Sequence, residues 1–231
     1  MKKRIVVLTG AGVSAESGIN TFRDADGLWE GHDVMEVASP QGFANNPSLV
    51  LDFYNQRRRQ LKKVQPNVAH ISLAKLEKYY DVSIITQNVD DLHERGGSTN
   101  VIHLHGELLK ARSVKNEVKI LDWHTDLKIG DFSAEGHQLR PHIVWFGEMV
   151  PLLETAAALV EKADVVIIIG TSMQVYPAAG LIDFAKQNVP IYFIDPKPSI
   201  SENDYKNLSI IEETAANGVP TLVEDLIRRA T

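Results

Sequence analysis

Four short motifs carry most of the side chains in this sequence that could do chemistry, and the first is rich in glycine. Gly10 and Gly12 follow the apolar run Ile5–Leu8, and Gly18 and Phe22–Arg23 come after them. Glycines between a strand and a helix let the backbone turn tightly and pass close to a ligand, and the free N–H groups at the helix start favour a pyrophosphate. Gly-x-Gly-x-x-Ala alone is a weak dinucleotide signal, and the continuation makes it more specific.

The second motif places amide and carboxylate groups directly after another apolar run. Gln87, Asn88 and Asp90 follow Val82–Ile85. Asn88 or Asp90 could bond a carboxamide group. A helix N-cap with solvated acids explains the same residues equally well.

The third motif contains two histidines at the end of an apolar run. His103 lies within the apolar run Val101–Leu104, and His105 and Gly106 follow directly after it. Residues two apart in a strand share a face. Histidine exchanges a proton near neutral pH, so either residue could act as a general base, or both could be structural.

The fourth motif is Gly170–Thr171–Ser172, which follows Val165–Ile169. Its hydroxyl groups and close backbone could bind a ribose or a phosphate. A simple turn from strand to helix is the alternative.

The elements that carry these motifs predict an α/β fold. The expected strands are the apolar runs Ile5–Leu8, Val82–Ile85, Val101–Leu104, Val165–Ile169 and Pro190–Ile194. Helical patterns lie between them, including Ala69–Tyr79 and Leu152–Lys162. This alternation indicates a doubly wound, Rossmann-like parallel sheet, in which ligands bind at the carboxyl ends of the strands.

Two stretches interrupt this alternation and predict a smaller inserted module. Residues 24–68 contain loop signals and an arginine-rich helix that starts at Pro47–Ser48, and residues 111–140 form short strands and charged loops. Residues 1–23, 69–110 and 141–231 then form the Rossmann-like domain. An ordinary NAD dehydrogenase places a strand ending in Asp or Glu about 20 residues after the glycine loop. That region is loop-like here, so hydride transfer is not expected.

Composition excludes several classes of protein. The 231 residues carry a net charge of -6, which gives no electrostatic reason to bind nucleic acid. No cysteine is present, so disulfides, thiol catalysis and a cysteine-ligated zinc are excluded. No stretch approaches the ~20 apolar residues of a membrane span, and the short run after Met1–Arg4 lacks the features of a signal peptide. We expect a cytoplasmic protein that binds neither nucleic acid nor a membrane.

Taken together and in this order, the motifs resemble the sirtuin family of NAD-dependent protein-lysine deacylases. The similarity extends from about residue 5 to about residue 222. The matching segments are Gly10–Ala11–Gly12 with Ser14, Ser17–Gly18 and Phe22–Arg23, then Gln87–Asn88–Val89–Asp90, His105–Gly106, Phe146–Gly147–Glu148 and Gly170–Thr171–Ser172.

The resemblance implies a role for each matching residue. His105 would be the general base, and Asn88 and Asp90 would take part in catalysis at the nicotinamide pocket. Gly147, Glu148 and Val175 would pair with an acyl-lysine peptide by strand addition. NAD, consumed as a co-substrate, would contact Gly10, Ala11, Gly12, Ala15, Ile19, Phe22, Arg23, Gln87, Asn88, Asp90, Gly170, Thr171, Ser172, Asp195 and Ala215. Asp195, where the family often has Asn, favours NAD over NADP because it would repel a 2′-phosphate.

A further pair of residues resembles the sirtuins that remove succinyl, malonyl or glutaryl groups. Tyr54 and Arg57 share a helix face at i, i+3 and could grip a carboxylate. Ala38 matches a small residue that widens the acyl pocket in that branch. A tyrosine packed on a solvated arginine is the alternative. We interpret Arg58 and Arg59 as solvated.

The chain departs from most sirtuins where those carry four zinc-binding cysteines. We therefore expect no zinc. His124 and His137, with Asp122 and Asp126, have no standard metal-ligand spacing. An apolar set could supply a replacement core: Val118, Ile120, Leu121, Trp123, Leu127 and Ile129.

The leading prediction is a deacylase that removes acetyl, succinyl and malonyl groups and releases nicotinamide and O-acyl-ADP-ribose. A mono-ADP-ribosyltransferase and a catalytically silent NAD-binding protein are the alternatives. Nicotinamide release that requires an acyl-lysine peptide separates the first from the other two.

Overall fold

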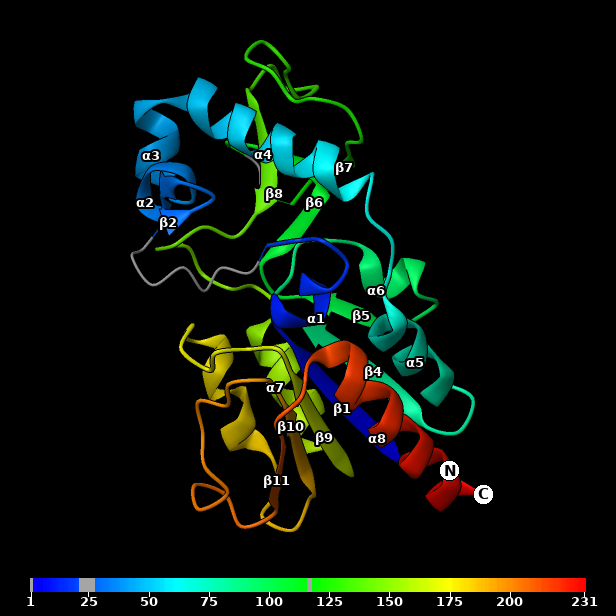
Figure 1. Ribbon diagram of the computed structural model, residues 1–231. Coiled ribbons are helices and arrows are strands. Elements are labelled where there is room, and N and C mark those ends of the chain that lie inside the picture. The colour runs from blue at the N-terminus through cyan, green and yellow to red at the C-terminus, as the bar shows by residue number, and fades with distance from the viewer. Residues whose placement is uncertain (1, 21–27, 116–117) are drawn as a thin grey trace.

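The computed structural model describes residues 2–20, 28–115 and 118–231 (Figure 1). At its centre lies a six-stranded parallel sheet of order β11-β10-β9-β1-β4-β5. Its strands are β1 (Arg4–Thr9), β4 (Asp81–Thr86), β5 (Val101–His103), β9 (Val165–Ile169), β10 (Ile191–Ile194) and β11 (Leu208–Ile211). The central strands are apolar and buried on both faces, which is typical of a sheet covered by helices on each side. The α/β, doubly wound fold predicted from the sequence is confirmed.

Helices cover both faces of this sheet (Figure 1). On one face α5 (Val68–Leu76) and α8 (Ala215–Ala230) pack against β1, β4 and β9. On the other face lie α7 (Leu153–Glu161) and the 3-10 helix η1 (Ala178–Phe184). The chain runs from β1 outward through β4 to β5 and then returns to β9 beside β1. Strand order reverses between β1 and β9, and such a switch point forms a ligand-binding crevice at the carboxyl ends of the strands.

Two short helices follow strands at this edge of the sheet. They are α1 (Gly12–Ala15), which follows β1, and α6 (Leu92–Arg95), which follows the loop after β4. Within the described residues no helix is long and apolar enough to cross a membrane.

A smaller module lies beyond the carboxyl ends of the strands (Figure 1). It contains α2 (Val34–Val37), α3 (Pro40–Asn45), α4 (Pro47–Leu61), the hairpin of β2 (Leu28–Trp29) and β3 (His32–Asp33), and an antiparallel sheet of order β7-β6-β8. The strands of that sheet are β6 (Gly106–Ser113), β7 (Ile120–Asp122) and β8 (Leu139–Ile143). Strands β6 and β8 run across the expected domain limits at 110 and 141, and the division of the chain into domains stays a prediction.

The helix α4 begins where the sequence predicted. Asn46 caps it by accepting a hydrogen bond from the Leu49 N–H, and Pro47 occupies the first turn, where its missing N–H costs nothing. Phe53 and Tyr54 are buried against the sheet of the small module. One face of α4 therefore covers that sheet.

The expected replacement core is half correct. Leu127 is fully buried and packs with Leu51, Ala111 and Leu139, and Leu121 and Trp123 contact this cluster. Val118, Ile120 and Ile129 are exposed, so the prediction for these three was wrong. The other apolar side chains of this cluster come from α3, α4, β6 and β8 instead.

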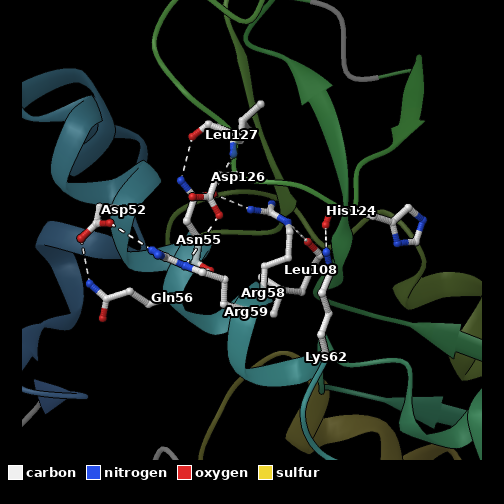
Figure 2. Close-up of polar contacts among 10 residues, drawn as sticks. All are labelled: Asp52, Asn55, Gln56, Arg58, Arg59, Lys62, Leu108, His124, Asp126 and Leu127. Atoms are coloured by element: carbon white, nitrogen blue, oxygen red, sulfur yellow. Dashed lines mark hydrogen bonds and ion pairs between the residues drawn. The ribbon is translucent and has the colours of Figure 1, made fainter.

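A polar cluster joins α4 to the loop after β7 (Figure 2). The Asn55 side chain donates to the Leu127 carbonyl at 2.9 Å and accepts from the Leu127 N–H at 2.8 Å. Arg58 donates to Asn55 Oδ1 at 2.6 Å and to the Leu108 carbonyl at 3.1 Å. Arg58 is only 1% exposed, so its interpretation as solvated was wrong. Arg59, in contrast, has an exposed side chain that pairs with Asp52 and Asp126.

Candidate functional site

A cavity of about 290 Å³ lies between the carboxyl ends of the strands and the small module. Most of the residues singled out from the sequence line it. They are Gly10, Ala11, Ile19, Ala38, Tyr54, Arg57, Gln87, Asn88, Asp90, His105, Gly147, Glu148, Gly170, Thr171, Ser172 and Val175. The four motifs are therefore brought together on one surface.

The two glycine motifs pack backbone against backbone at one end of the cavity. The Gly10 N–H donates to the Ile169 carbonyl at 3.0 Å, and the Gly12 N–H donates to the Gly170 carbonyl at 2.8 Å. A Cβ on Gly12 would lie 2.6 Å from the Gly170 Cα, which is closer than atoms can pack. Gly12 does not line the cavity, so the structure gives it a packing role.

The loop after β4 forms a buried chain of hydrogen bonds. Asn88 Nδ2 donates to Ser14 Oγ at 3.1 Å, and Ser14 Oγ donates to Asp90 Oδ2 at 3.0 Å. Burial raises the pKa of Asp90 to about 6, although hydrogen bonds from the Leu92 N–H and Ser14 act against it. In the sequence, Ser14 stood out only as part of the glycine motif. Its fully buried position between the amide and the carboxylate assigns it to the site.

The imidazole of His105 is held in one orientation. Its Nδ1 lies 3.0 Å from the Gln87 carbonyl oxygen, which can only accept a hydrogen bond, so Nδ1 carries a proton. Burial lowers the pKa of His105 below its usual value. The neutral ring therefore keeps its lone pair on Nε2, as a general base requires.

His103 has no nitrogen left for catalysis. Its Nδ1 lies 3.0 Å from the Asn88 carbonyl, and its Nε2 lies 2.7 Å from Glu94 Oε1. It is not among the residues that line the cavity. Of the two histidines in the motif, only His105 is placed to accept a proton from a ligand in the cavity.

The far end of the cavity carries the aromatic and basic pair of α4. Tyr54 is fully buried, and its hydroxyl accepts a hydrogen bond from Trp145 Nε1 at 2.9 Å. The Arg57 guanidinium lies 4.7 Å from the centre of the Phe53 ring. Its Nε and Nη1 atoms are buried and have no hydrogen-bond partner in the described part of the chain. A buried cationic group of this kind requires an acceptor.

Glu148 lies at the rim of the cavity and is already paired. Its carboxylate accepts from Arg140 at 2.6 Å and from Arg112 at 3.1 Å, and its own N–H donates to the Trp145 carbonyl. Burial acts to raise the pKa of Glu148, but these arginines outweigh it and the pKa lies below its usual value. The side chain holds the rim in place, and Gly147 and Val175 line the cavity beside it.

Several predicted cofactor contacts lie elsewhere. Ala15 and the buried residues Asp195 and Ala215 do not line the cavity. Asp195 follows β10, and its carboxylate accepts from the Lys197 N–H at 2.8 Å. Phe22 and Arg23 lie outside the described residues. Contacts of these five residues with NAD stay predictions.

The described residues include no group of three or more His, Asp or Glu side chains placed to hold a metal ion. The expectation that the protein contains no zinc is not tested by this finding.

We compared the sequence and the fold of this chain with those of known proteins. Residues 10–177 match the profile of the Sir2 family. An NAD-dependent protein deacylase of Helicobacter pylori (strain ATCC 700392 / 26695) is 58% identical over 229 residues, covering 99% of this chain and 100% of the relative. The solved structure of a Sir2 homologue in complex with NAD has 42% sequence identity and a TM-score of 0.88, covering 100% of this chain and 91% of that one. A Sir2 variant bound to a deacetylated p53 peptide and 3′-O-acetyl ADP ribose has 28% identity and a TM-score of 0.80, covering 97% and 94%. The chain belongs to the Sir2 family.

Proposed function

We propose that this protein is an NAD-dependent protein-lysine deacylase that removes succinyl and malonyl groups as well as acetyl groups. Its relatives are named NAD-dependent protein deacylases, which makes it an NAD-consuming enzyme. The observation that carries the acyl preference is the cavity itself. It joins the Asn88–Asp90 pair, the Nε2 side of His105 and the Arg57 guanidinium, whose Nε and Nη1 have no partner in the described part of the chain, in one space.

The residues at the sheet end fit NAD. Gly10 and Gly170 face the cavity without side chains, so a pyrophosphate could approach their backbone. Asn88 and Asp90 offer a donor and an acceptor for a carboxamide, in a loop that Ser14 holds together. When bound, NAD supplies the ribose carbon that the acyl oxygen of the modified lysine attacks as nicotinamide leaves.

His105 then supplies the proton acceptor. With Nδ1 held by the Gln87 carbonyl, its Nε2 would accept a proton from a ribose hydroxyl of bound NAD and so activate that oxygen toward the acyl carbon. Water completes the transfer to give free lysine and O-acyl-ADP-ribose. No metal and no triad is needed for these proton transfers.

The acyl preference is supported by the other end of the cavity. An acetyl group presents only a methyl group there, whereas a succinyl or malonyl group ends in a carboxylate. Arg57 can donate to that carboxylate through the two nitrogens that lack partners, and Tyr54 can add its hydroxyl proton. Ala38 lines the cavity with only a methyl group, which leaves room for the longer chain.

A panel of acetyl-, malonyl- and succinyl-lysine peptides of one sequence tests this proposal. We expect nicotinamide release only when an acyl-lysine peptide is present, with higher kcat/KM for the acidic acyl groups. Nicotinamide release without a peptide, with ADP-ribose attached to protein, would support the transferase instead. No release from any mixture would support a silent NAD-binding protein.

A further inference from the structure

The loop that carries Asn88 and Asp90 is held through consecutive backbone carbonyls. The Gln87 carbonyl accepts from His105 Nδ1 at 3.0 Å, and the Asn88 carbonyl lies 3.0 Å from His103 Nδ1. The Val89 carbonyl accepts from the Leu108 N–H at 2.8 Å. The segment from β5 to β6 therefore holds this loop in place. His103 contacts the peptide unit that lies between Asn88 and Asp90, the two functional residues of the loop.

His103 faces an acceptor on each side. The Asn88 carbonyl faces Nδ1, and the Glu94 carboxylate lies 2.7 Å from Nε2. A neutral imidazole has a single N–H, so it can satisfy only one of these acceptors, whereas the imidazolium satisfies both. The His103 side chain is 7% exposed, so water cannot easily replace either bond.

The charged groups around His103 also favour the imidazolium. Glu94 on α6 contacts it, Glu107 on β6 and Asp90 in the loop act on it through their charges, and the nearby His93 is uncharged. Lys110 pairs with Glu107 at 2.8 Å, and its charge also acts on Glu94. Burial by itself lowers the pKa of His103, but the hydrogen bond and charge of Glu94 outweigh it, so the pKa is raised.

We propose that His103 is a positioning residue for the nicotinamide side of the site. As an imidazolium it bridges Glu94 and the Asn88 carbonyl, and so fixes the directions of the Asn88 and Asp90 side chains. The role of these side chains toward nicotinamide rests on the proposed function. The charge state of His103 and its hold on the loop do not.

Two substitutions of His103 separate positioning from general stability. His103→Asn keeps a side-chain N–H at the place of Nδ1 but cannot reach Glu94, and His103→Ala removes both bonds. With acyl-lysine peptide and NAD, we expect His103→Ala to raise the inhibition constant of nicotinamide about tenfold, the effect of one lost hydrogen bond. His103→Asn should stay within about threefold of the parent, and the KM for peptide should not change in either variant.

Imidazole nitrogen NMR tests the charge without any turnover. We expect His103 to be protonated at pH 7, and Glu94→Gln to lower its pKa by about one pH unit or more. Glu107→Gln is the matched control, because Glu107 pairs with Lys110 and makes no bond to His103, so its effect should be smaller.

A neutral His103 at pH 7 would overturn the proposal. Equal nicotinamide inhibition constants in His103→Ala, His103→Asn and the parent would also overturn it. The same holds if both variants show a parallel rise in the KM for peptide, fall in kcat and fall in Tm. If the parent does not cleave NAD, the proposed function fails. The NMR result and the amide shifts of residues 87–90 in the Asn and Ala variants then decide the positioning role alone.

Discussion

Replacing Arg57 by methionine should separate desuccinylation from deacetylation. Methionine keeps an unbranched stem against the Phe53 ring and removes the guanidinium, whose Nε and Nη1 are buried and find no partner within residues 2–20, 28–115 and 118–231. A hydrogen bond to a charged group contributes roughly 1.5–3 kcal/mol. That corresponds to a fall of about tenfold to over a hundredfold in kcat/KM for succinyl- and malonyl-lysine peptides. Because the Arg57 side chain as a whole is partly exposed and water screens its charge, we expect the lower end of this range.

Deacetylation should change by less than about threefold, since an acetyl group has no carboxylate for Arg57 to bind. The assay is steady-state nicotinamide release with peptides that differ only in the acyl group. Arg59→Met is the control. It lies on the same helix, and its side chain is 54% exposed. Arg58 is unsuitable as a control, because it is buried and bonded to Asn55 and Leu108.

Equal losses of both activities in Arg57→Met would refute this reasoning. Arg57 would then support NAD or the fold of α4, and the preference for acidic acyl groups would fall. The membership of the chain in the Sir2 family would stand.

The remaining predictions concern the base, the metal and acid stability. His105→Ala should keep the fold and NAD binding, measured by calorimetry, and lose on the order of 10²–10⁴-fold in deacylation, whereas near-normal turnover would assign the base elsewhere. The purified protein should contain no stoichiometric zinc, and a chelator should change neither its Tm nor its activity; one tightly held metal per chain by elemental analysis would contradict this and direct attention to His124 and His137. Burial lowers the pKa of the His70 imidazole to about 4 in the folded protein, whereas in the unfolded chain the imidazole binds a proton near pH 6.5. The free energy of unfolding therefore falls as the pH drops from about 6.5 to 4. His70→Gln keeps an acceptor for the Asn67 N–H, as a capping box allows, and should reduce the fall in Tm between pH 7 and 5; an unchanged slope would count against a buried neutral His70.

The apolar runs predicted the strands well where burial is complete. Val165–Ile169 is buried at every position and is β9 as expected. Strand β11 was missed, because Leu208–Ile211 lies at the edge of the sheet and is only partly buried. An edge strand with mixed exposure has neither a continuous apolar run nor a strict alternation, so its sequence carries little signal.

The arginines of α4 show a different limit. Helical spacing correctly placed Tyr54 and Arg57 on one face, and both line the cavity. It could not place Arg58, because the partners that bury it are the Leu108 carbonyl and the Asn55 amide. Asn55 is in turn fixed by Leu127, in a loop whose path depends on tertiary packing. A run of charged residues predicts a solvated face only while no buried backbone acceptor comes within reach.

The same contacts connect the two ends of the cavity. The Leu108 carbonyl accepts from Arg58 on α4, and the Leu108 N–H donates to the Val89 carbonyl in the loop of Asn88 and Asp90 (Figure 2 shows the first of these bonds). One strand residue thus holds both the helix that carries Arg57 and the loop that carries the amide and carboxylate. Removing Arg58 would leave a buried carbonyl unpaired and disturb both ends at once. The preference for an acyl group can therefore be tested cleanly at Arg57, whose Nε and Nη1 have no hydrogen-bond partner among the described residues, and not at its neighbour.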